Sequence, residues 1–369
     1  MRFAADENNT KITGRTIYRD GVRYLGYTGS SVSFRFKGKT AKVELVSDAS
    51  THVKRDYAWV AVFVKEEKDN EISYGAAADE EPYKRFCLDK DEAEYVLYES
   101  DEEKTVTVTL IKYSEAEYAA CGIKWIETDS EEILTPPAAK KLKIEMVGDS
   151  ITCGYGNEGG VEETQHDTSK ENPMGAYSLL TATHLDADVN VVAWNGKGVI
   201  TAYIGEDAPK VKDADWLVPM LYEYTDAGCE RDYLHTPEDK WEKWDNSNFI
   251  PDIITVYLGT NDASYTDNDA ARNEEFVNGY TKFLGTIRSK NPEIPILCML
   301  GTMDKRLCGS VERAVELFNS KNNTDNVYYL ELPFQDEADG LSINWHPTVK
   351  THRKTAEIVE KKIIEILKK

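Results

Sequence analysis

The sequence predicts two domains, an all-β domain of the jelly-roll or sandwich kind followed by an α/β domain built on a parallel sheet. Up to about residue 130, apolar and polar side chains alternate, which is typical of strands with one face in a core. After residue 140, continuous apolar runs alternate with amphipathic segments, which is typical of strands buried on both faces and separated by helices. The 369-residue length suits two domains of roughly 100–200 residues each.

The first domain, residues 1–130, is expected to hold short strands separated by clusters of glycine, asparagine and aspartate. The alternating runs are 32–36, 41–45, 57–63 and 105–110. No helical periodicity of any length accompanies them. Many short strands at this spacing favour a sandwich or jelly roll.

Residues 131–140 are charged and contain two adjacent prolines, so we expect a linker there. The second domain, residues 141–369, is expected to be a parallel sheet with helices on both faces. Its expected strands are 143–147, 188–194, 252–258, 294–300 and 327–330. Its expected helices are 176–185, 273–289, 311–319 and 355–369. In such folds the site lies beyond the carboxyl ends of the strands.

Charge and composition exclude several classes of partner. Lys and Arg total 44 against 66 Asp and Glu, which gives a net charge of −22. Nucleic acid and anionic membrane surfaces both require a basic footprint, so we expect neither as a partner. The beginning of the chain has no apolar signal region, which favours a cytoplasmic location unless a signal has been removed.

The cysteines and histidines do not show the spacing of a metal or disulfide framework. Six cysteines are scattered without CxxC pairs, so we expect free thiols, mostly buried. Asp267-Asn268-Asp269 lacks the glycine and the closing glutamate of a calcium-binding EF-hand loop. We therefore expect no metal and no cofactor.

Four short motifs fall at the ends of the expected strands or before the last helix. Gly148-Asp149-Ser150 follows the first strand, and a serine there needs a base to become a nucleophile. Gly198 follows the second strand, where a glycine lets a backbone N–H approach a developing oxyanion. Asn261 follows the third strand and offers an amide donor, while His346 precedes the last helix and offers a base. Each motif alone is typical of an ordinary turn.

In this order the four motifs resemble the SGNH, or GDSL, hydrolase superfamily, whose fold is flavodoxin-like. The resemblance implies that Ser150 is the nucleophile and His346 the base. It also implies an oxyanion hole formed by the N–H groups of Ser150 and Gly198 and the amide of Asn261. The catalysis implied needs no metal and no organic cofactor.

The residues narrow the resemblance to carbohydrate esterase family 2. The supporting motifs are 144–156, Glu171-Asn172-Pro173, 196–199, 258–262 and Trp345-His346-Pro347. That family also carries an N-terminal jelly-roll domain. The resemblance implies removal of O-acetyl groups from plant cell-wall carbohydrate such as xylan, glucomannan or their oligosaccharides.

One position departs from the superfamily pattern, which places Asp three residues before the histidine. That position is Ile343 here. A backbone carbonyl, the amide oxygen of Asn344 or the carboxylate of Asp339 could orient His346 instead, and we favour the carbonyl.

Several aromatic side chains adjoin the motifs and could face a sugar ring. They are Tyr155, Trp194, Tyr265 and Trp345, and Trp345 is favoured because it adjoins His346. We expect Asp149 and Asp262 to hydrogen-bond within their loops, and His352 on the last helix to lie at the surface. The long polar segment 202–250 is expected to cover one side of the site.

Two other functions compete with the carbohydrate esterase. One is a lipase, thioesterase or arylesterase of the same superfamily, although the charge of −22 favours a hydrophilic substrate. The other is an inert carbohydrate-binding protein, against which the intact set of four motif residues speaks. The β domain could bind sugar or be structural, and a homo-oligomer is left open.

Overall fold

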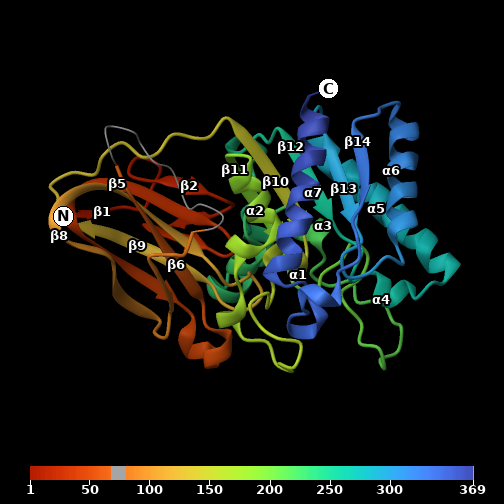
Figure 1. Cartoon of the computed structure of the whole chain (residues 1–369), viewed down its shortest axis with the longest axis horizontal. Helices are drawn as coiled ribbons and strands as arrows, with labels where there is room; N and C mark the ends of the chain where they lie inside the picture. Colours follow the sequence, from red (N-terminus) through yellow and green to blue (C-terminus); the bar gives the residue numbers. More distant parts are fainter. Residues whose placement is uncertain (68–79, 369) are drawn as a thin grey trace.

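The computed structural model describes residues 1–67 and 80–368. In this part of the chain, the N-terminal domain is one antiparallel sheet of nine strands (Figure 1). The strand order is β3-β4-β9-β5-β8-β6-β7, with β1 pairing on β9 and β2 on β5. The strands are β1 (Arg2–Phe3), β2 (Lys11–Thr13), β3 (Ile17–Arg19), β4 (Val22–Leu25), β5 (Ser31–Ser47), β6 (Trp59–Glu66), β7 (Lys84–Cys87), β8 (Glu92–Lys112) and β9 (Cys121–Thr128).

Two long strands shape this domain into the expected sandwich-like half-barrel. The expected strands 32–36 and 41–45 are one continuous 17-residue strand, β5, paired along most of its length with the 21-residue β8. Register shifts between Gly38 and Thr40 and between Ala41 and Lys42 mark irregularities, which bend a strand and increase its twist. Phe34, Phe36 and other alternating side chains fill the core of this domain, as their period of two requires.

The C-terminal part is a five-stranded parallel sheet in the order β11-β10-β12-β13-β14. Its strands are β10 (Leu142–Gly148), β11 (Ala187–Ala193), β12 (Ile253–Tyr257), β13 (Ile296–Leu300) and β14 (Val327–Glu331). Every residue of β11, β12 and β13 is buried, which explains why these segments read as apolar runs without alternation. All five expected strands are confirmed.

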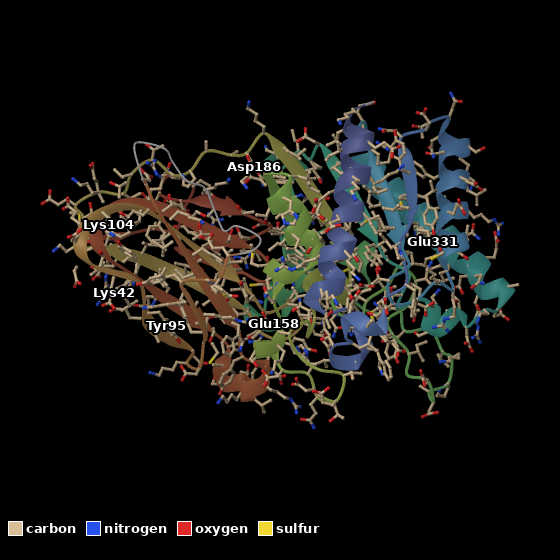
Figure 2. All side chains as sticks on the ribbon, in the orientation of Figure 1. Lys42, Tyr95, Lys104, Glu158, Asp186 and Glu331 are labelled. Atoms are coloured by element: carbon tan, nitrogen blue, oxygen red, sulfur yellow. The ribbon has the colours of Figure 1, made fainter. Side chains whose placement is uncertain are left out.

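Helices cover this sheet on both sides. They are α1 (Ser150–Cys153), α2 (Tyr177–His184), α3 (Val218–Leu221), α4 (Ala263–Thr266), α5 (Ala270–Lys290), α6 (Cys308–Asn322) and α7 (Val349–Leu367). α2 packs against α7, and α5 packs against α6 (Figure 1; Figure 2 adds the side chains in the same orientation). Because the strand order reverses direction after β11, right-handed crossovers place these two pairs on opposite faces.

The expectation for His352 is wrong. This residue is 1% exposed, and its Nδ1 accepts a hydrogen bond of 3.2 Å from the backbone N–H of Tyr177. α7 begins six residues before the expected helix, and its first turns pack against the 173–177 region. His352 therefore belongs to the contact between α7 and α2.

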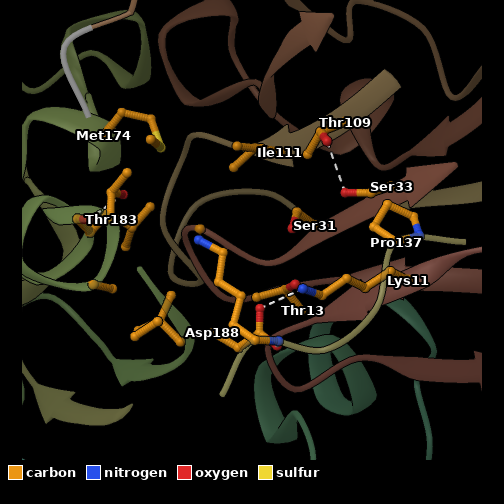
Figure 3. Close-up of a pocket in the computed structure, with 16 residues that line it drawn as sticks. Lys11, Thr13, Ser31, Ser33, Thr109, Ile111, Pro137, Met174, Thr183 and Asp188 are labelled. Carbon is orange, nitrogen blue, oxygen red and sulfur yellow. Dashed lines mark hydrogen bonds and ion pairs between the residues drawn. The ribbon is translucent and has the colours of Figure 1, made fainter. Parts of the chain in front are cut away.

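The two sheets are joined by ion pairs that bridge the domains. Arg15 is fully buried, lies 3.3 Å from Glu145 and donates to the carbonyl oxygens of Tyr222 and Tyr224. Lys11 and Asp188 approach to 2.5 Å beside a small cavity of about 80 Å³ between the domains (Figure 3). These contacts anchor the N-terminal domain against β10 and β11 of the parallel sheet.

The connection between the sheets has little regular structure. Within 129–141, the structure gives one β-bridge, between Leu134 and Arg35 of β5. The division into 1–130, 131–140 and 141–369 stays a prediction. In the segment 202–250, α3 and short turns replace long helices, and it packs against β11 through the aromatic residues around Trp194.

The six cysteines are all free, and five of them are buried, as expected. Among the residues that the structure describes, no helix combines the length and apolar character needed to cross a membrane.

Candidate active site

A cavity of about 630 Å³ opens at the carboxyl edge of the parallel sheet. Ser150 follows β10, Asn195 follows β11, Asn261 follows β12, Arg306 follows β13 and His346 follows β14. All five line this one cavity. Loops from every strand of the sheet thus converge at the place that the fold class predicts for a ligand.

Ser150 and His346 lie at the base of this cavity within hydrogen-bond distance. The Oγ of Ser150 is 2.8 Å from Nε2 of His346. Ser150 is the first residue of α1, where backbone N–H groups have no acceptor within the helix. Asp149 caps that turn by accepting from the N–H of Ile151 at 3.1 Å. The serine is therefore fixed beside a base and beside an orphan N–H.

The other ring nitrogen of His346 is held by the backbone. Nδ1 lies 3.0 Å from the carbonyl oxygen of Ile343. The Asn344 amide instead donates to the Tyr155 hydroxyl at 3.0 Å. Asp339 forms ion pairs with Lys350 and Lys354, at 2.9 and 2.5 Å. Of the three orienting groups weighed from the sequence, the carbonyl is the one that contacts His346.

The neighbours of His346 determine its protonation state and tautomer. Burial lowers the pKa of His346 to about 4, against the contrary effect of the Ile343 and Asn344 backbone. The imidazole is therefore neutral at pH 7 and carries one proton. Because a carbonyl oxygen only accepts, that proton lies on Nδ1, which leaves Nε2 free to accept from Ser150.

A strained turn presents His346 to the cavity. Asn344 and Trp345 adopt positive φ angles of 52° and 65°, which are uncommon for residues with a side chain. The N–H of Ser342 donates to the carbonyl of His346 at 2.9 Å, and the Ser342 hydroxyl donates to the carbonyl of Gly156. Backbone strain of this kind costs on the order of 1–3 kcal/mol per residue and clusters at functional sites.

Asn261 follows β12 and lies between Ser150 and His346 in the chain. Its Nδ2 donates to Oδ2 of Asp149 at 3.2 Å and to the carbonyl of Lys197 at 3.1 Å. Burial, together with Asp262, raises the pKa of Asp149 to about 7. The two acceptors hold the nitrogen end of the Asn261 amide between the motif loops.

Gly198 lies beside the cavity wall but is not among the residues that line it, whereas Gly196 is. A side chain at Gly198 would bring Cβ to 2.3 Å from Oδ2 of Asp262. Asp262 accepts from the N–H groups of Val199, Ile200 and Thr201 at 2.8–3.3 Å. These hydrogen bonds hold the turn after Gly198 in place. The loop roles expected for Asp149 and Asp262 are confirmed. The oxyanion role of Gly198 stays a prediction.

Of the four aromatic residues expected to face a sugar ring, two line the cavity and two do not. Trp345, which is 63% exposed, and Tyr155 line the cavity. Trp194 is 2% exposed and packs with Trp216 and Trp241, outside the cavity, because its position after β11 faces the 202–250 segment. Tyr265 also lies outside, with its hydroxyl 3.1 Å from Glu275.

Several cavity residues were not anticipated from the sequence. They are Tyr203, Glu206, Ser264, Met303, Asp304 and Arg306. Arg306 is paired with Asp304 at 2.6 Å and lies beside Asp267. The position of Met303 to Arg306 just after β13 is a usable signal, because the carboxyl ends of neighbouring strands meet at the same edge. Tyr203 and Glu206 belong to an irregular segment and carry no such signal.

Comparison with known proteins agrees with this architecture. Residues 146–354 match the GDSL-like Lipase/Acylhydrolase family, and residues 12–137 match the Carbohydrate esterase 2 N-terminal family. The chain is 28% identical to Cellulase/esterase CelE of Acetivibrio thermocellus, over 95% of this chain and 39% of that protein. It is 26% identical to an acetylxylan esterase/glucomannan deacetylase of Cellvibrio japonicus, over 99% of this chain and 91% of that protein.

A solved structure shows the same fold over nearly the whole chain. A family two carbohydrate esterase from Clostridium thermocellum, in complex with cellohexaose, superposes with a TM-score of 0.80 and 27% identity. The match covers 97% of this chain and 99% of that one. The chain thus belongs to the GDSL-like lipase/acylhydrolase family, and it is an esterase whose hydrolase domain follows a domain of the carbohydrate esterase 2 N-terminal kind.

Proposed function

We propose that this protein removes O-acetyl groups from plant cell-wall carbohydrate, such as xylan, glucomannan or their oligosaccharides, through an acetyl-Ser150 intermediate. The observation that carries the proposal is the 2.8 Å contact between Ser150 Oγ and His346 Nε2 in an open cavity walled by an exposed tryptophan. The names of the A. thermocellus and C. japonicus relatives support the carbohydrate substrate.

The first half of the reaction transfers the acetyl group to the enzyme. Ser150 Oγ attacks the acetyl carbonyl carbon while Nε2 of His346 takes the hydroxyl proton. The C–O bond to the sugar then breaks, and the sugar oxygen leaves with the proton that His346 returns. The Ile343 carbonyl accepts from Nδ1–H throughout, so it keeps the ring oriented and partly stabilises the imidazolium.

The second half releases acetate. Water attacks the acetyl-serine carbonyl, and His346 takes its proton and returns one to Ser150 Oγ. In each half the carbonyl oxygen becomes an oxyanion. Its proposed hydrogen-bond donors are the N–H groups of Ser150 and Gly198 and the side-chain amide of Asn261. To donate to the oxyanion, the Asn261 amide uses one of the hydrogens that point at Asp149 and at the Lys197 carbonyl in this structure.

The character of the cavity favours a sugar over a lipid. Trp345 and Tyr203 are 63% and 58% exposed, and they offer flat apolar faces for sugar rings. Glu206, Asp304 and Arg306 line the same cavity and offer acceptors and donors for hydroxyl groups. An acyl chain offers these groups no hydrogen bond, whereas sugar hydroxyl groups do.

Release of acetate from acetylated xylo- and manno-oligosaccharides, followed by NMR, tests this proposal. We expect the acetyl signals of particular hydroxyls to disappear with the wild-type chain and to persist with Ser150→Ala. Ser289→Ala is the matched control, because that serine is exposed near the end of α5, far along the chain from the motifs. Cleavage of 4-nitrophenyl acetate without release from any sugar would overturn the carbohydrate assignment and keep the esterase.

A further inference from the structure

A second polar cluster lies where the two domains meet, and it does not line the cavity. It consists of Glu115 from the β8–β9 connection and of His166 and Glu171, which flank the short turn Thr168–Lys170. Glu115 is fully buried, and the side chains of His166 and Glu171 are 8% and 1% exposed. One ligand atom from each residue lies within 4.8 Å of the other two.

Each carboxylate uses one oxygen and leaves the other unused. Oε2 of Glu171 accepts from the N–H of Glu115, and Oε2 of Glu115 accepts from the N–H of Asn195, both at 2.8 Å. Oε1 of each glutamate has no hydrogen-bond partner among the described residues, and neither ring nitrogen of His166 has one. Oε1 of Glu171 lies 3.1 Å from Nε2 of His166. All of these atoms without a hydrogen-bond partner belong to the three residues of the cluster, and each is of a kind that can ligate a metal ion.

Two cations near the cluster, Lys112 and Arg85, donate to backbone carbonyls, and Arg85 also pairs with Glu158 at 2.6 Å. Lys112 Nζ donates to the carbonyl oxygens of Ser114 and Glu115, at 2.7 and 3.0 Å. Arg85 Nη2 donates to those of Ser169 and Glu171, at 2.7 and 2.6 Å. Burial and mutual repulsion penalise the charged forms of two carboxylates this close together, and Lys112 and Arg85 donate to backbone carbonyls rather than to these carboxylate oxygens. The cluster therefore needs either a proton or a cation.

The imidazole of His166 is held in one orientation. Its ring stacks between Tyr118 and Tyr155, with centroid distances of 4.4 and 4.2 Å and interplanar angles of 24° and 14°. Ring nitrogens coordinate in the plane of the ring, and this clamp fixes that plane before any ligand arrives. Tyr155 also contacts the ring of His346 at 4.5 Å, so the cluster lies one aromatic ring away from the active site.

We propose that Glu115, His166 and Glu171 bind one divalent transition-metal ion, with Zn²⁺ the best match. One imidazole nitrogen and two carboxylate oxygens are a donor set that suits Zn²⁺, whereas Ca²⁺ and Mg²⁺ prefer oxygen alone. The ion neutralises the two carboxylates and joins the β domain to the hydrolase domain. It lies outside the reaction path, so its role is structural. The spacing of the three residues does not predict this site, because Glu115 lies about 50 residues before His166 and Glu171 and comes from the other domain.

Zinc content and heat stability test this site in the full chain. The protein is stripped with a chelating resin, dialysed against Zn²⁺, freed of unbound metal and analysed by mass spectrometry for zinc. We expect one Zn²⁺ per wild-type chain and at least tenfold weaker binding in Glu171→Gln and His166→Gln. Added Zn²⁺ raises the Tm of the wild type by a few degrees and leaves that of both variants unchanged.

His184→Gln is the matched control. His184 also lies beside a carboxylate, with Nδ1 2.6 Å from Glu360, but on the surface and with one carboxylate alone. It is expected to bind zinc as the wild type does. The proposal is overturned if the folded wild type binds no zinc. If Glu171→Gln is then at least as heat-stable as the wild type, the two carboxyls share a proton instead of a metal ion. Equal zinc binding by Glu171→Gln and the wild type also overturns it.

Discussion

Nδ1 of His346 lies 3.0 Å from the carbonyl oxygen of Ile343, at the position where the superfamily usually has an aspartate side chain. The Ile343 side chain points elsewhere. A Cβ built on Gly156 or Gly159 would approach Ile343 to 2.9 or 2.5 Å, so its side chain packs against these two glycines. The base is therefore oriented by its own backbone, in the form of a dyad.

This packing predicts that restoring the aspartate does not help. In Ile343→Asp we expect no gain in kcat, because the side chain faces Gly156 and Gly159 rather than His346. A buried, unpaired carboxylate lowers the free energy of unfolding by roughly 3 kcal/mol or more. Urea denaturation and initial rates on one acetyl ester measure the two effects. Ile343→Val is the control, with an expected cost of about 1 kcal/mol. A rise in kcat for Ile343→Asp would contradict the orientation described here.

The low pKa of His346 predicts activity well into acid solution. Burial lowers this pKa to about 4, so the base is neutral above that pH and is lost as the pH falls through it. At pH 5, about 90% of the plateau value of kcat/KM should remain, whereas an unperturbed histidine near 6.5 would leave about 3%. The pH profile of kcat/KM for the free enzyme gives the answer, with circular dichroism to confirm that the chain stays folded. An acid limb near pH 6.5 would show that His346 is not desolvated as the structure has it.

The donor role of Asn261 predicts a defect in rate rather than in binding. Asn261→Ala removes one oxyanion donor, which costs on the order of 100- to 1000-fold in kcat. KM should change little, because the donor acts on the transition state. Asn248→Ala, at an exposed position, should leave both constants unchanged. A rise in KM with kcat preserved would instead place Asn261 in substrate binding.

The exposure of Trp345 predicts a defect confined to sugar substrates. Trp345→Ala removes a wall of the cavity, and we expect KM for acetylated oligosaccharides to rise roughly tenfold. The kinetics with 4-nitrophenyl acetate, which lacks a sugar ring, should stay close to those of the wild type. Phe334→Ala is the control, since Phe334 is similarly exposed at 57% but lies outside the cavity. Equal losses on both substrates would mean that Trp345 acts by holding the His346 turn.

Local periodicity was enough to predict most of the fold. The five strands of the parallel sheet and the helices between them follow from apolar runs and amphipathic stripes, since these elements have short, buried patterns. The β domain was harder. The alternation predicts 32–36 and 41–45 as separate strands because Gly38 interrupts it, yet the chain continues through a register shift as one strand.

At the site, the residues that belong to short motifs were predictable, and those without a motif were not. Ser150, Asn261 and His346 follow β10, β12 and β14, and they meet in one cavity. Trp194 adjoins β11 but packs into a separate cluster, because Gly228 leaves room for its ring. Tyr203 comes from an irregular loop whose path depends on tertiary contacts that no periodicity records.

The most direct test is to trap the acetyl group on the enzyme. The wild-type chain is mixed with an acetylated xylo-oligosaccharide, quenched in acid within the first turnover and digested for peptide mass spectrometry. We expect one acetyl group on Ser150 in the wild type, none anywhere in Ser150→Ala, and strongly reduced labelling in His346→Gln. Acetylation at another residue, or undiminished acetate release by Ser150→Ala, would contradict the Ser150–His346 dyad.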